Sequence, residues 1–360
     1  MRIALVHDYL SQDGGAERVL RAIHEIWPKA PIFVLIHDQK KIDYFKNHTV
    51  NQSFIRWLPF GKSKFPWYLG LMPLATEKHD LEKFDVVISS SSSFAKGIIT
   101  SPNTLHISYC HTPPRFLWSD THEYTDQIKH RLISKIFLPQ LMHKLRMWDK
   151  MTVDRVDHWL ANSQTVRQRI HKYYRQDSLV IYPPVDVDNY TIAPEVQNYF
   201  VAGGRIMQYK RLDIVIQTFN RLRWPLKIFG SESFDFGTEY KRLKNMARQN
   251  IEFLGRISEE QKSQLLSQAR AFIHPQLEDF GITPVEAMAS GRPVIAYSGG
   301  GASETIQHQK TGLFFHHQTW EHLLKTLQEF KQYSWDSIYI RDHATKFAKN
   351  IFQKKIQNYV

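Results

Sequence analysis

The chain has 360 residues, a formal net charge of +12, 42% hydrophobic residues and a single cysteine, Cys110. This length exceeds what one compact core usually carries, and the apolar content excludes a disordered chain, so two globular domains are expected. One cysteine excludes an internal disulfide, and no window approaches the roughly 20 apolar residues of a membrane-spanning helix. The composition predicts a cytoplasmic protein, soluble or peripheral, whose charge attracts polyanions such as nucleic acid, anionic lipid or phosphorylated substrates.

Short apolar segments alternate with amphipathic segments in the first half of the chain, which is typical of α/β domains with parallel sheets. The five serines from Ser89 to Ser93 are its one low-complexity stretch. A helix is expected within residues 11–27. Residues 158–174 are expected to form a strand followed by a second helix. Further strands are expected within residues 2–10, 31–37, 84–93, 105–114 and 178–190.

The alternation restarts near residue 200, so we place a domain boundary at Pro183–Pro184. Helices are expected within residues 210–222, 240–250 and 258–269. Strands are expected within residues 199–207, 226–230, 251–255, 271–275 and 292–297. Two doubly wound halves joined at this boundary predict a cleft, with ligand at the carboxyl ends of the strands.

Residues 278–291 contain a strong helix start and stop. Thr283 suits the N-cap, Pro284 the first helical position and Glu286 a capping-box position, while Gly291 suits the helix end. On this interpretation Glu286 only stabilises the helix.

The same segment also supports a binding interpretation. Glu278 and Asp279 lie before the helix, whose N-terminal N–H groups favour phosphate, while a carboxylate suits sugar hydroxyls. These features together suit a nucleotide sugar. The turn at 298–301 is either a second anion-binding turn or an ordinary loop.

Cations and glycines at other strand ends suit the same ligand. Arg205 and Lys210 flank a strand end and a helix start, where they either clamp a diphosphate or are solvated surface charges. Gly14 and Gly15 separate a strand from a helix, as a phosphate-approaching turn or a simple one. His111 follows a strand and either faces the cleft or is structural.

The set of motifs resembles the signature of retaining GT-B glycosyltransferases of family 4, group 1, and runs from residue 1 to the C-terminus. Within that family, the segments 109–118 and 278–297 resemble mannosyltransferases of bacterial polysaccharide and O-antigen assembly. The motifs that carry the family resemblance are Glu278-x7-Glu286 and the segments 14–20, 162–170, 181–186, 203–213 and 252–258.

The resemblance implies two Rossmann-like domains, an acceptor domain at 1–183 and a donor domain at 184–340, with a C-terminal helix at about 341–360 packed back on the first. It implies that Arg205 and Lys210 hold the diphosphate and that Glu278 and His111 contact the donor sugar. Further donor contacts are implied for Gly14, Gly15, Gly255, Arg256, Phe280, Gly281, Ile282, Thr283 and Glu286.

The implied reaction transfers a hexose, with mannose from GDP-mannose expected, and retains the anomeric configuration. Fixed cations and N–H dipoles would stabilise the leaving diphosphate, so no metal and no cofactor are expected. Retention can follow double displacement through Glu278 or front-face attack, and front-face attack is favoured because the family's first glutamate generally binds the sugar.

Residues 53–73 mix basic and aromatic side chains, which suits the interface of an anionic membrane. Arg56, Lys62 and Lys64 are the cations, and Trp57 and Trp67 are among the aromatics. The alternative is a basic surface segment whose aromatics belong to the core. We expect a lipid-linked or glycan acceptor and a peripheral location on the inner face of a bacterial cytoplasmic membrane.

Rival functions lack supporting motifs. A Rossmann dehydrogenase would require a G-x-G-x-x-G turn, which residues 7–18 do not contain. A nucleic-acid-binding protein would explain the charge, but no reader motif is present and no nucleic-acid partner is expected. A UDP-hexose-dependent transferase, a nucleotide-sugar epimerase, a catalytically silent partner subunit and a non-catalytic nucleotide- or nucleic-acid-binding protein remain as alternatives.

Overall fold

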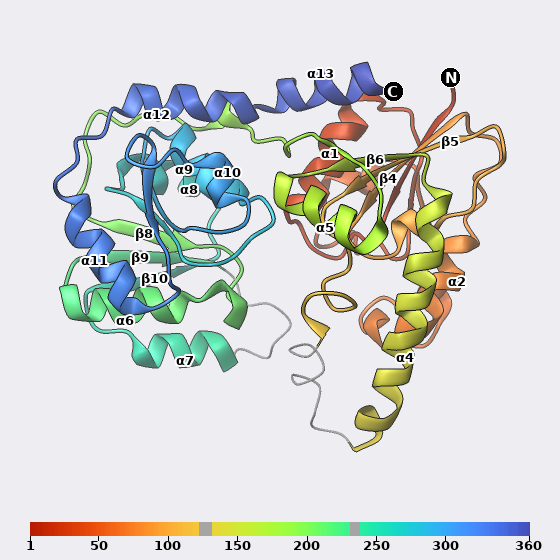
Figure 1. Ribbon diagram of the computed structural model, residues 1–360, viewed down its shortest axis with the longest axis horizontal. Coiled ribbons are helices and arrows are strands. Elements are labelled where there is room, and N and C mark those ends of the chain that lie inside the picture. The colour runs from red at the N-terminus through yellow and green to blue at the C-terminus, as the bar shows by residue number, and fades with distance from the viewer. Residues whose placement is uncertain (122–131, 231–237) are drawn as a thin grey trace. The chain divides into compact units, whose positions relative to one another are not determined.

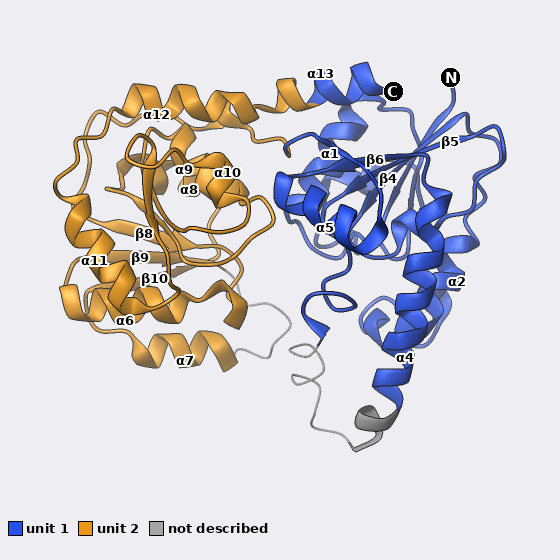
Figure 2. Ribbon diagram, viewed as in Figure 1, with its two compact units in different colours: residues 1–182, 353–360 blue, residues 183–352 orange. Residues whose placement is uncertain are grey.

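The computed structural model describes residues 1–121, 132–230 and 238–360, and the chain divides into two compact units. The first unit comprises residues 1–182 and 353–360, and the second comprises residues 183–352 (Figure 2). Within the described residues, no helix combines the length and the apolar character needed to cross a membrane.

The first unit is built on a parallel sheet with the strand order β3-β2-β1-β4-β5-β6-β7. Its strands are β1 (Ile3–His7), β2 (Ile32–Val34), β3 (Val50–Gln52), β4 (Val86–Ser91), β5 (Leu105–Cys110), β6 (His158–Ala161) and β7 (Leu179–Val180). Its described helices include α1 (Gly15–Ile26), α2 (Met72–Glu77), α4 (Leu132–Met151) and α5 (Gln164–Tyr174). The Ser163 hydroxyl caps α5 by accepting from the Val166 N–H at 3.1 Å.

The second unit repeats this architecture with the strand order β10-β9-β8-β11-β12-β13. Its strands are β8 (Phe200–Gly203), β9 (Leu226–Phe229), β10 (Ile251–Gly255), β11 (Phe272–His274), β12 (Val294–Tyr297) and β13 (Gly312–Phe315). Its described helices are α6 (Leu212–Leu222), α7 (Thr238–Met246), α8 (Glu259–Gln268), α9 (Ile282–Ala289), α10 (Ala302–Thr305), α11 (Trp320–Phe330) and α12 (Ser337–Ala344). In Figure 1, α6, α7 and α11 lie on one side of this sheet, and α8, α9 and α12 on the other.

The predicted class, α/β with two Rossmann-like parallel sheets, is confirmed. Strand order reverses beside β1 in the first sheet and beside β8 in the second, since β1 lies between β2 and β4, and β8 between β9 and β11. Parallel α/β sheets bind ligands at the carboxyl ends of the strands next to such a reversal. The loops after β1, β4, β8 and β11 are therefore the places to look for a site.

The C-terminal segment differs from the expectation that residues 341–360 pack on the first domain. Helix α12 packs on α9, and Arg341 donates to the carbonyl oxygens of Tyr190 and Ala289, so this part belongs to the second unit. Helix α13 (Lys349–Tyr359) begins in the second unit and ends in the first. Of the C-terminal segment, only residues 353–360 belong to the first unit. There Gln353 donates to the Ala22 carbonyl at 3.1 Å and to the Glu25 carboxylate at 2.9 Å.

Candidate active site

The candidate site residues fall into two groups, one in each unit. In the second unit, the loop after β8 leads through a short 3₁₀ turn (Gln208–Lys210) into α6. Arg211 joins the turn to the helix in the left-handed conformation, with φ of 52°, which costs roughly 1 kcal/mol for a residue with a Cβ. Arg205 is half-buried in the same loop, and the structure records no ion pair for it within the described residues.

Lys210 and Glu278, both predicted from the sequence, are brought together. The Lys210 ammonium forms an ion pair with Oε1 of Glu278, and the two side chains are only 13% and 20% exposed. His274, at the end of β11, places Nε2 3.8 Å from the other carboxylate oxygen. Burial, and secondarily the charge of Lys210, lowers the pKa of His274 to about 3, so this imidazole is neutral and Lys210 is the cation that balances Glu278.

The predicted cap of α9 is wrong. The helix begins at Ile282, its N-cap is Gly281 with φ of 88°, and no side chain caps it. Thr283 is thus the second helical residue, and the left-handed backbone at Gly281 turns the chain into the helix. Gly291, with φ of 72°, follows the helix end as expected.

Glu286 is not part of a capping box. Its side chain is 1% exposed, and its Oε1 accepts from the Lys262 ammonium at 2.9 Å. The capping box lies instead at α8, where the Ser258 hydroxyl accepts from the Gln261 N–H and the Gln261 side chain accepts from the Ser258 N–H. Lys262 was not predicted, because 24 residues separate it from Glu286 and nothing local marks the pair.

The glycine turn at 298–301 packs on the loop that carries Glu278. The Gly301 N–H donates to the Glu278 carbonyl at 2.9 Å. A Cβ at Gly300 would lie 2.1 Å from that carbonyl oxygen, and one at Gly301 would lie 2.2 Å from the Phe280 Cα. Close approach of two backbones therefore accounts for these glycines. The Phe280 ring is buried and contacts Phe347 at a centroid distance of 5.7 Å.

Two further glycines at strand ends, Gly204 and Gly255, have open space where a side chain would be. Gly204 follows β8 with φ of 126°, and Gly255 ends β10 with φ of 70°. A Cβ at either position would meet nothing within 4 Å, so the backbone conformation, not a neighbour, accounts for the glycine there. Arg256, which follows Gly255, is exposed.

In the first unit, the predicted glycine turn begins α1. Gly14 is the N-cap, Gly15 is the first helical residue, and Glu17 turns back so that Oε2 accepts from the Gly14 N–H at 2.9 Å. The other carboxylate oxygen of Glu17 lies 3.9 Å from Nε2 of His7, at the end of β1. Glu17 was overlooked, although an acid three residues after a predicted N-cap is a recognised signal.

His111 lies directly after β5 and is 9% exposed. Its Nε2 lies 2.8 Å from the Ser90 hydroxyl, which is itself 3.1 Å from Nδ1 of His7. Burial, with a smaller contribution from His7, lowers the pKa of His111 to about 3. The sequence indicated His111 but neither His7 nor Ser90.

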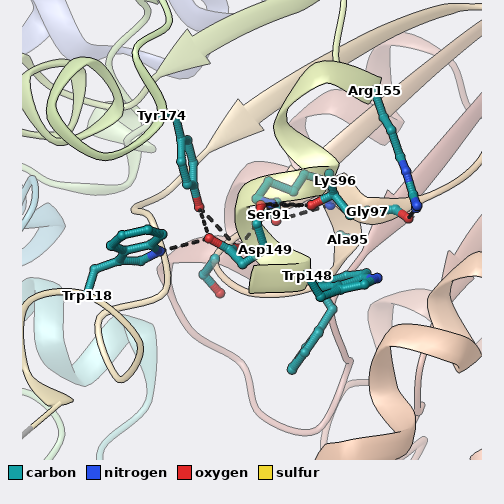
Figure 3. A network of polar contacts seen from close by, with 12 residues as sticks. Ser91, Ala95, Lys96, Gly97, Trp118, Trp148, Asp149, Arg155 and Tyr174 are labelled. Carbon is teal, nitrogen blue, oxygen red and sulfur yellow. Dashed lines mark hydrogen bonds and ion pairs between the residues drawn. The ribbon is translucent and has the colours of Figure 1, made fainter. Parts of the chain in front are cut away.

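A buried ion pair anchors the segment that follows His111 (Figure 3). The Lys96 ammonium lies 3.0 Å from Oδ1 of Asp149 and also donates to the Asp149 carbonyl and the Thr152 hydroxyl. Oδ2 of Asp149 accepts from the indole N–H of Trp118 at 2.8 Å and from the hydroxyl of Tyr174 at 3.0 Å. Burial lowers the pKa of Lys96, while Asp149 opposes this change.

Aromatic side chains of residues 53–73 are divided between core and surface. Phe65 is buried, whereas Trp57, Phe60 and Trp67 are 75%, 66% and 67% exposed. The Arg56 guanidinium lies 4.1 Å from the centre of the Trp57 ring, and the Lys64 ammonium lies 4.3 Å from that of Trp67. The exposed rings and the cations Arg56, Lys62 and Lys64 define a basic aromatic surface on the first unit.

Two family models together match residues 13–352. Residues 13–189 match glycosyltransferase family 4, and residues 189–352 match glycosyl transferases group 1. In fold, the chain is similar to Anabaena HepE in complex with UDP and glucose, with a TM-score of 0.72, 17% identity and coverage of 100% and 99% of the two chains.

Curated relatives are similar over part of their length. The O-antigen chain mannosyltransferase RfbU of Salmonella typhimurium is 32% identical over 155 residues, which are 41% of this chain and 43% of that protein. The alpha-1,3/1,6-mannosyltransferase ALG2 of Dictyostelium discoideum is 25% identical over 279 residues, which are 64% and 63% of the two chains. The chain thus spans about half of the length of these relatives.

Proposed function

Because the chain belongs to the group 1, family 4 glycosyltransferases of the GT-B fold, we propose that it transfers mannose from GDP-mannose to a lipid-linked or glycan acceptor in bacterial surface-glycan assembly. The observation that carries the proposal is the pairing of Lys210 with Glu278 next to the strand-order reversal of the second sheet. Similarity to the mannosyltransferases RfbU and ALG2 supports the choice of sugar.

We assign Lys210 and Arg205 to the leaving diphosphate and Glu278 to hydroxyls of the transferred sugar. Breaking the glycosidic bond places negative charge on the diphosphate and positive charge on the sugar, so fixed cations act most strongly where that charge develops. An ammonium has three donors, so Lys210 can keep its bond to Glu278 while it donates to a phosphate oxygen. Glu278 is thereby oriented before the donor binds.

The remaining assignments follow the positions of the residues at strand and helix ends. The first turn of α9, from Gly281 to Thr283, offers backbone N–H groups to the diphosphate. Gly255 and Arg256 are assigned to the nucleobase, Gly14 and Gly15 to the diphosphate, and His111 to the sugar. Glu286 is assigned to the ribose hydroxyls. This assignment requires the hydroxyls to reach a carboxylate that already accepts a hydrogen bond from the Lys262 ammonium.

We further propose that the anomeric configuration is retained by front-face attack and that no metal ion takes part. In this mechanism the leaving phosphate accepts the acceptor's proton, so Glu278 forms no covalent bond to the sugar. A glycosyl-enzyme trapped on Glu278 with a slow substrate would contradict front-face attack. Loss of transfer in EDTA, restored by a divalent ion, would contradict metal independence.

The nucleotide assignment is tested by thermal-shift binding of GDP, UDP, ADP and NAD without metal. We expect GDP to stabilise the wild type and Lys325→Ala, which removes an exposed lysine from α11, but not Lys210→Ala. Stabilisation by UDP alone would redirect the donor assignment, and stabilisation by NAD alone or by none of them would refute the transferase proposal. GDP-mannose consumption that depends on added lipid-linked acceptor separates a transferase from an epimerase.

The basic aromatic surface supports peripheral binding to the inner face of an anionic membrane. Exposed indoles with adjacent cations match the headgroup region, where rings insert and cations meet lipid phosphate. We expect the protein to sediment with phosphatidylglycerol vesicles and not with phosphatidylcholine vesicles. Trp57→Ala and Trp67→Ala should each weaken binding on the order of tenfold, whereas Ile338→Ala, an exposed apolar position in the second unit, should not. Equal binding by all variants would refute this surface.

A further inference from the structure

The serine run at 89–93 lies partly in β4, and its hydroxyls have distinct partners. Ser89 lies 2.9 Å from Nε2 of His106, while Ser92 donates to the Asp8 carboxylate at 2.9 Å. Ser90 differs from both, because its hydroxyl lies between two imidazoles, those of His7 and His111. It is also 1% exposed, so no solvent is available to satisfy it.

The sheet places Ser90 between these two histidines. Strand β4 pairs with β1 on one side and β5 on the other, with His7 directly beside Ser90 in the register and His111 following the end of β5. The hydroxyl is within 3.1 Å of Nδ1 of His7 and 2.8 Å of Nε2 of His111. A hydroxyl has one proton, so it can donate to only one of the two rings.

We propose that Ser90 is a positioning residue that fixes His111 as the tautomer with its proton on Nδ1, so that this N–H is offered to a hydroxyl of the transferred sugar. The identity of that ligand rests on the proposed function, whereas the tautomer does not.

The partners of His7 determine the direction of the hydrogen bonds. Nδ1 of His7 lies 3.0 Å from the Ser90 carbonyl oxygen, which can only accept, so Nδ1 of His7 carries a proton. That N–H also points at the Ser90 hydroxyl oxygen, which accepts it. The hydroxyl proton is then free to be donated to Nε2 of His111, which must be unprotonated to accept it. The remaining ring proton of His111 is on Nδ1.

The opposite tautomer would leave a buried group unsatisfied. If Nε2 of His111 carried the proton, the Ser90 oxygen would accept from both rings, and its own proton would have no acceptor in the described residues. A buried hydroxyl without a partner is unfavourable, so the hydrogen-bond count selects the Nδ1 tautomer.

The tautomer suits the charge that develops in the proposed reaction. The pKa of about 3 keeps the ring neutral, so Nδ1–H can orient a sugar hydroxyl without placing positive charge near a sugar that is itself becoming positive. An imidazolium in the same position would oppose that step. His111 is therefore expected to act as a neutral donor and not as an acid.

The tautomer can be measured directly by long-range proton–nitrogen NMR on the full-length protein with labelled histidine. His111→Gln identifies the ring signals by their disappearance. We expect the Nδ1 signal of His111 to lie in the range of protonated ring nitrogens and the Nε2 signal in the range of unprotonated ones. The reverse pattern would overturn the proposal. This measurement does not depend on whether a variant at Ser90 folds.

Variants then test the role of Ser90. Ser90→Ala should mix the two tautomers and lower kcat with GDP-mannose on the order of tenfold, with a smaller effect on KM. Ser90→Thr, which keeps the hydroxyl, should restore both. The matched control is Ser89→Ala, which removes an equally buried serine–histidine bond from the same strand and should leave the His111 spectrum and kcat unchanged. A pure Nδ1 tautomer in Ser90→Ala would refute a positioning role.

The two proposals fail separately. An Nδ1 tautomer in a protein that transfers no sugar would refute the proposed function and leave the role of Ser90 standing. Sugar transfer by a protein with the Nε2 tautomer would refute the role of Ser90 alone.

Discussion

Replacing Asp149 with asparagine should destabilise the first unit strongly, although the two side chains have nearly the same shape. The Asp149 carboxylate receives donors on both oxygens, Lys96 on Oδ1 and Trp118 and Tyr174 on Oδ2. An asparagine has one acceptor oxygen, so its NH₂ group must face either the ammonium or the indole and hydroxyl donors. Lys96 would remain as a buried cation without its counter-charge.

The expected cost is about 3–5 kcal/mol, the range measured when one partner of a buried ion pair is removed. Lys96→Met should cost less, since the remaining carboxylate keeps its two neutral donors. Asp120→Asn is the matched control, because its ion pair with Arg115 is about one-third exposed and such pairs contribute about 0–1 kcal/mol.

The assay is native-state hydrogen exchange of β4 and β5, with β8 and β11 of the second unit as an internal reference. Two units need not unfold in one transition, so exchange by segment is more informative than one melting temperature. If Asp149→Asn and Asp120→Asn lower protection by amounts within about 1 kcal/mol of each other, this account of the buried pair is wrong.

Three other predictions concern stability and use the same exchange measurement. Gly300→Ala should lower the free energy of unfolding more than Gly255→Ala. Both glycines adopt left-handed backbone, which costs alanine roughly 1 kcal/mol, but only a Cβ at Gly300 would also meet a backbone atom. Equal losses of stability would refute the packing explanation for Gly300. Lys262→Met should cost about 3 kcal/mol or more because it removes the cation paired with the buried carboxylate of Glu286. Glu259→Gln, whose side chain is 58% exposed, should cost under about 1 kcal/mol. Histidines whose folded pKa lies below their unfolded value stabilise the protein above pH 6.5, and this stability is lost as the pH falls toward 4, by about 1.4 kcal/mol per pH unit for each group. The first unit should therefore lose stability more steeply than the second, and equal slopes would contradict the assignment. The groups in the first unit are His24, His37, His79, His106 and His111, and those in the second are His274 and His343.

Periodicity and strand-end chemistry predict much of this molecule. Alternating strands and helices indicate both parallel sheets, because the 2- and 3.6-residue periods are local properties. Lys210 was predicted from its place between a strand end and a helix start, and Glu278 from its place before a helix. The neighbouring strands β8 and β11 bring the two side chains together. A parallel sheet gathers its carboxyl ends at one edge, so strand-end residues are the part of a site that a sequence shows best.

Side-chain pairs inside the units are not visible in the same way. The cap of α9 was assigned to Thr283 from residue type, but Gly281, with left-handed backbone, fills the position and no side chain caps the helix. Glu286 was a plausible cap partner in sequence, yet its partner comes from α8. Ser90 belongs to a run of identical residues, and only the strand register distinguishes it from Ser89.

The passage of α13 from the second unit into the first has a consequence for the order of folding during synthesis. Residues 353–360 contribute the buried Ile356 and, through Gln353, two hydrogen bonds to the region of α1, near the start of the chain. At about 5–20 residues per second, a ribosome needs roughly 10–35 s to go from residue 182 to residue 360. Throughout that interval the first unit is exposed without its last element, while the second unit emerges. The part of the protein that is made first is therefore the part that is completed last.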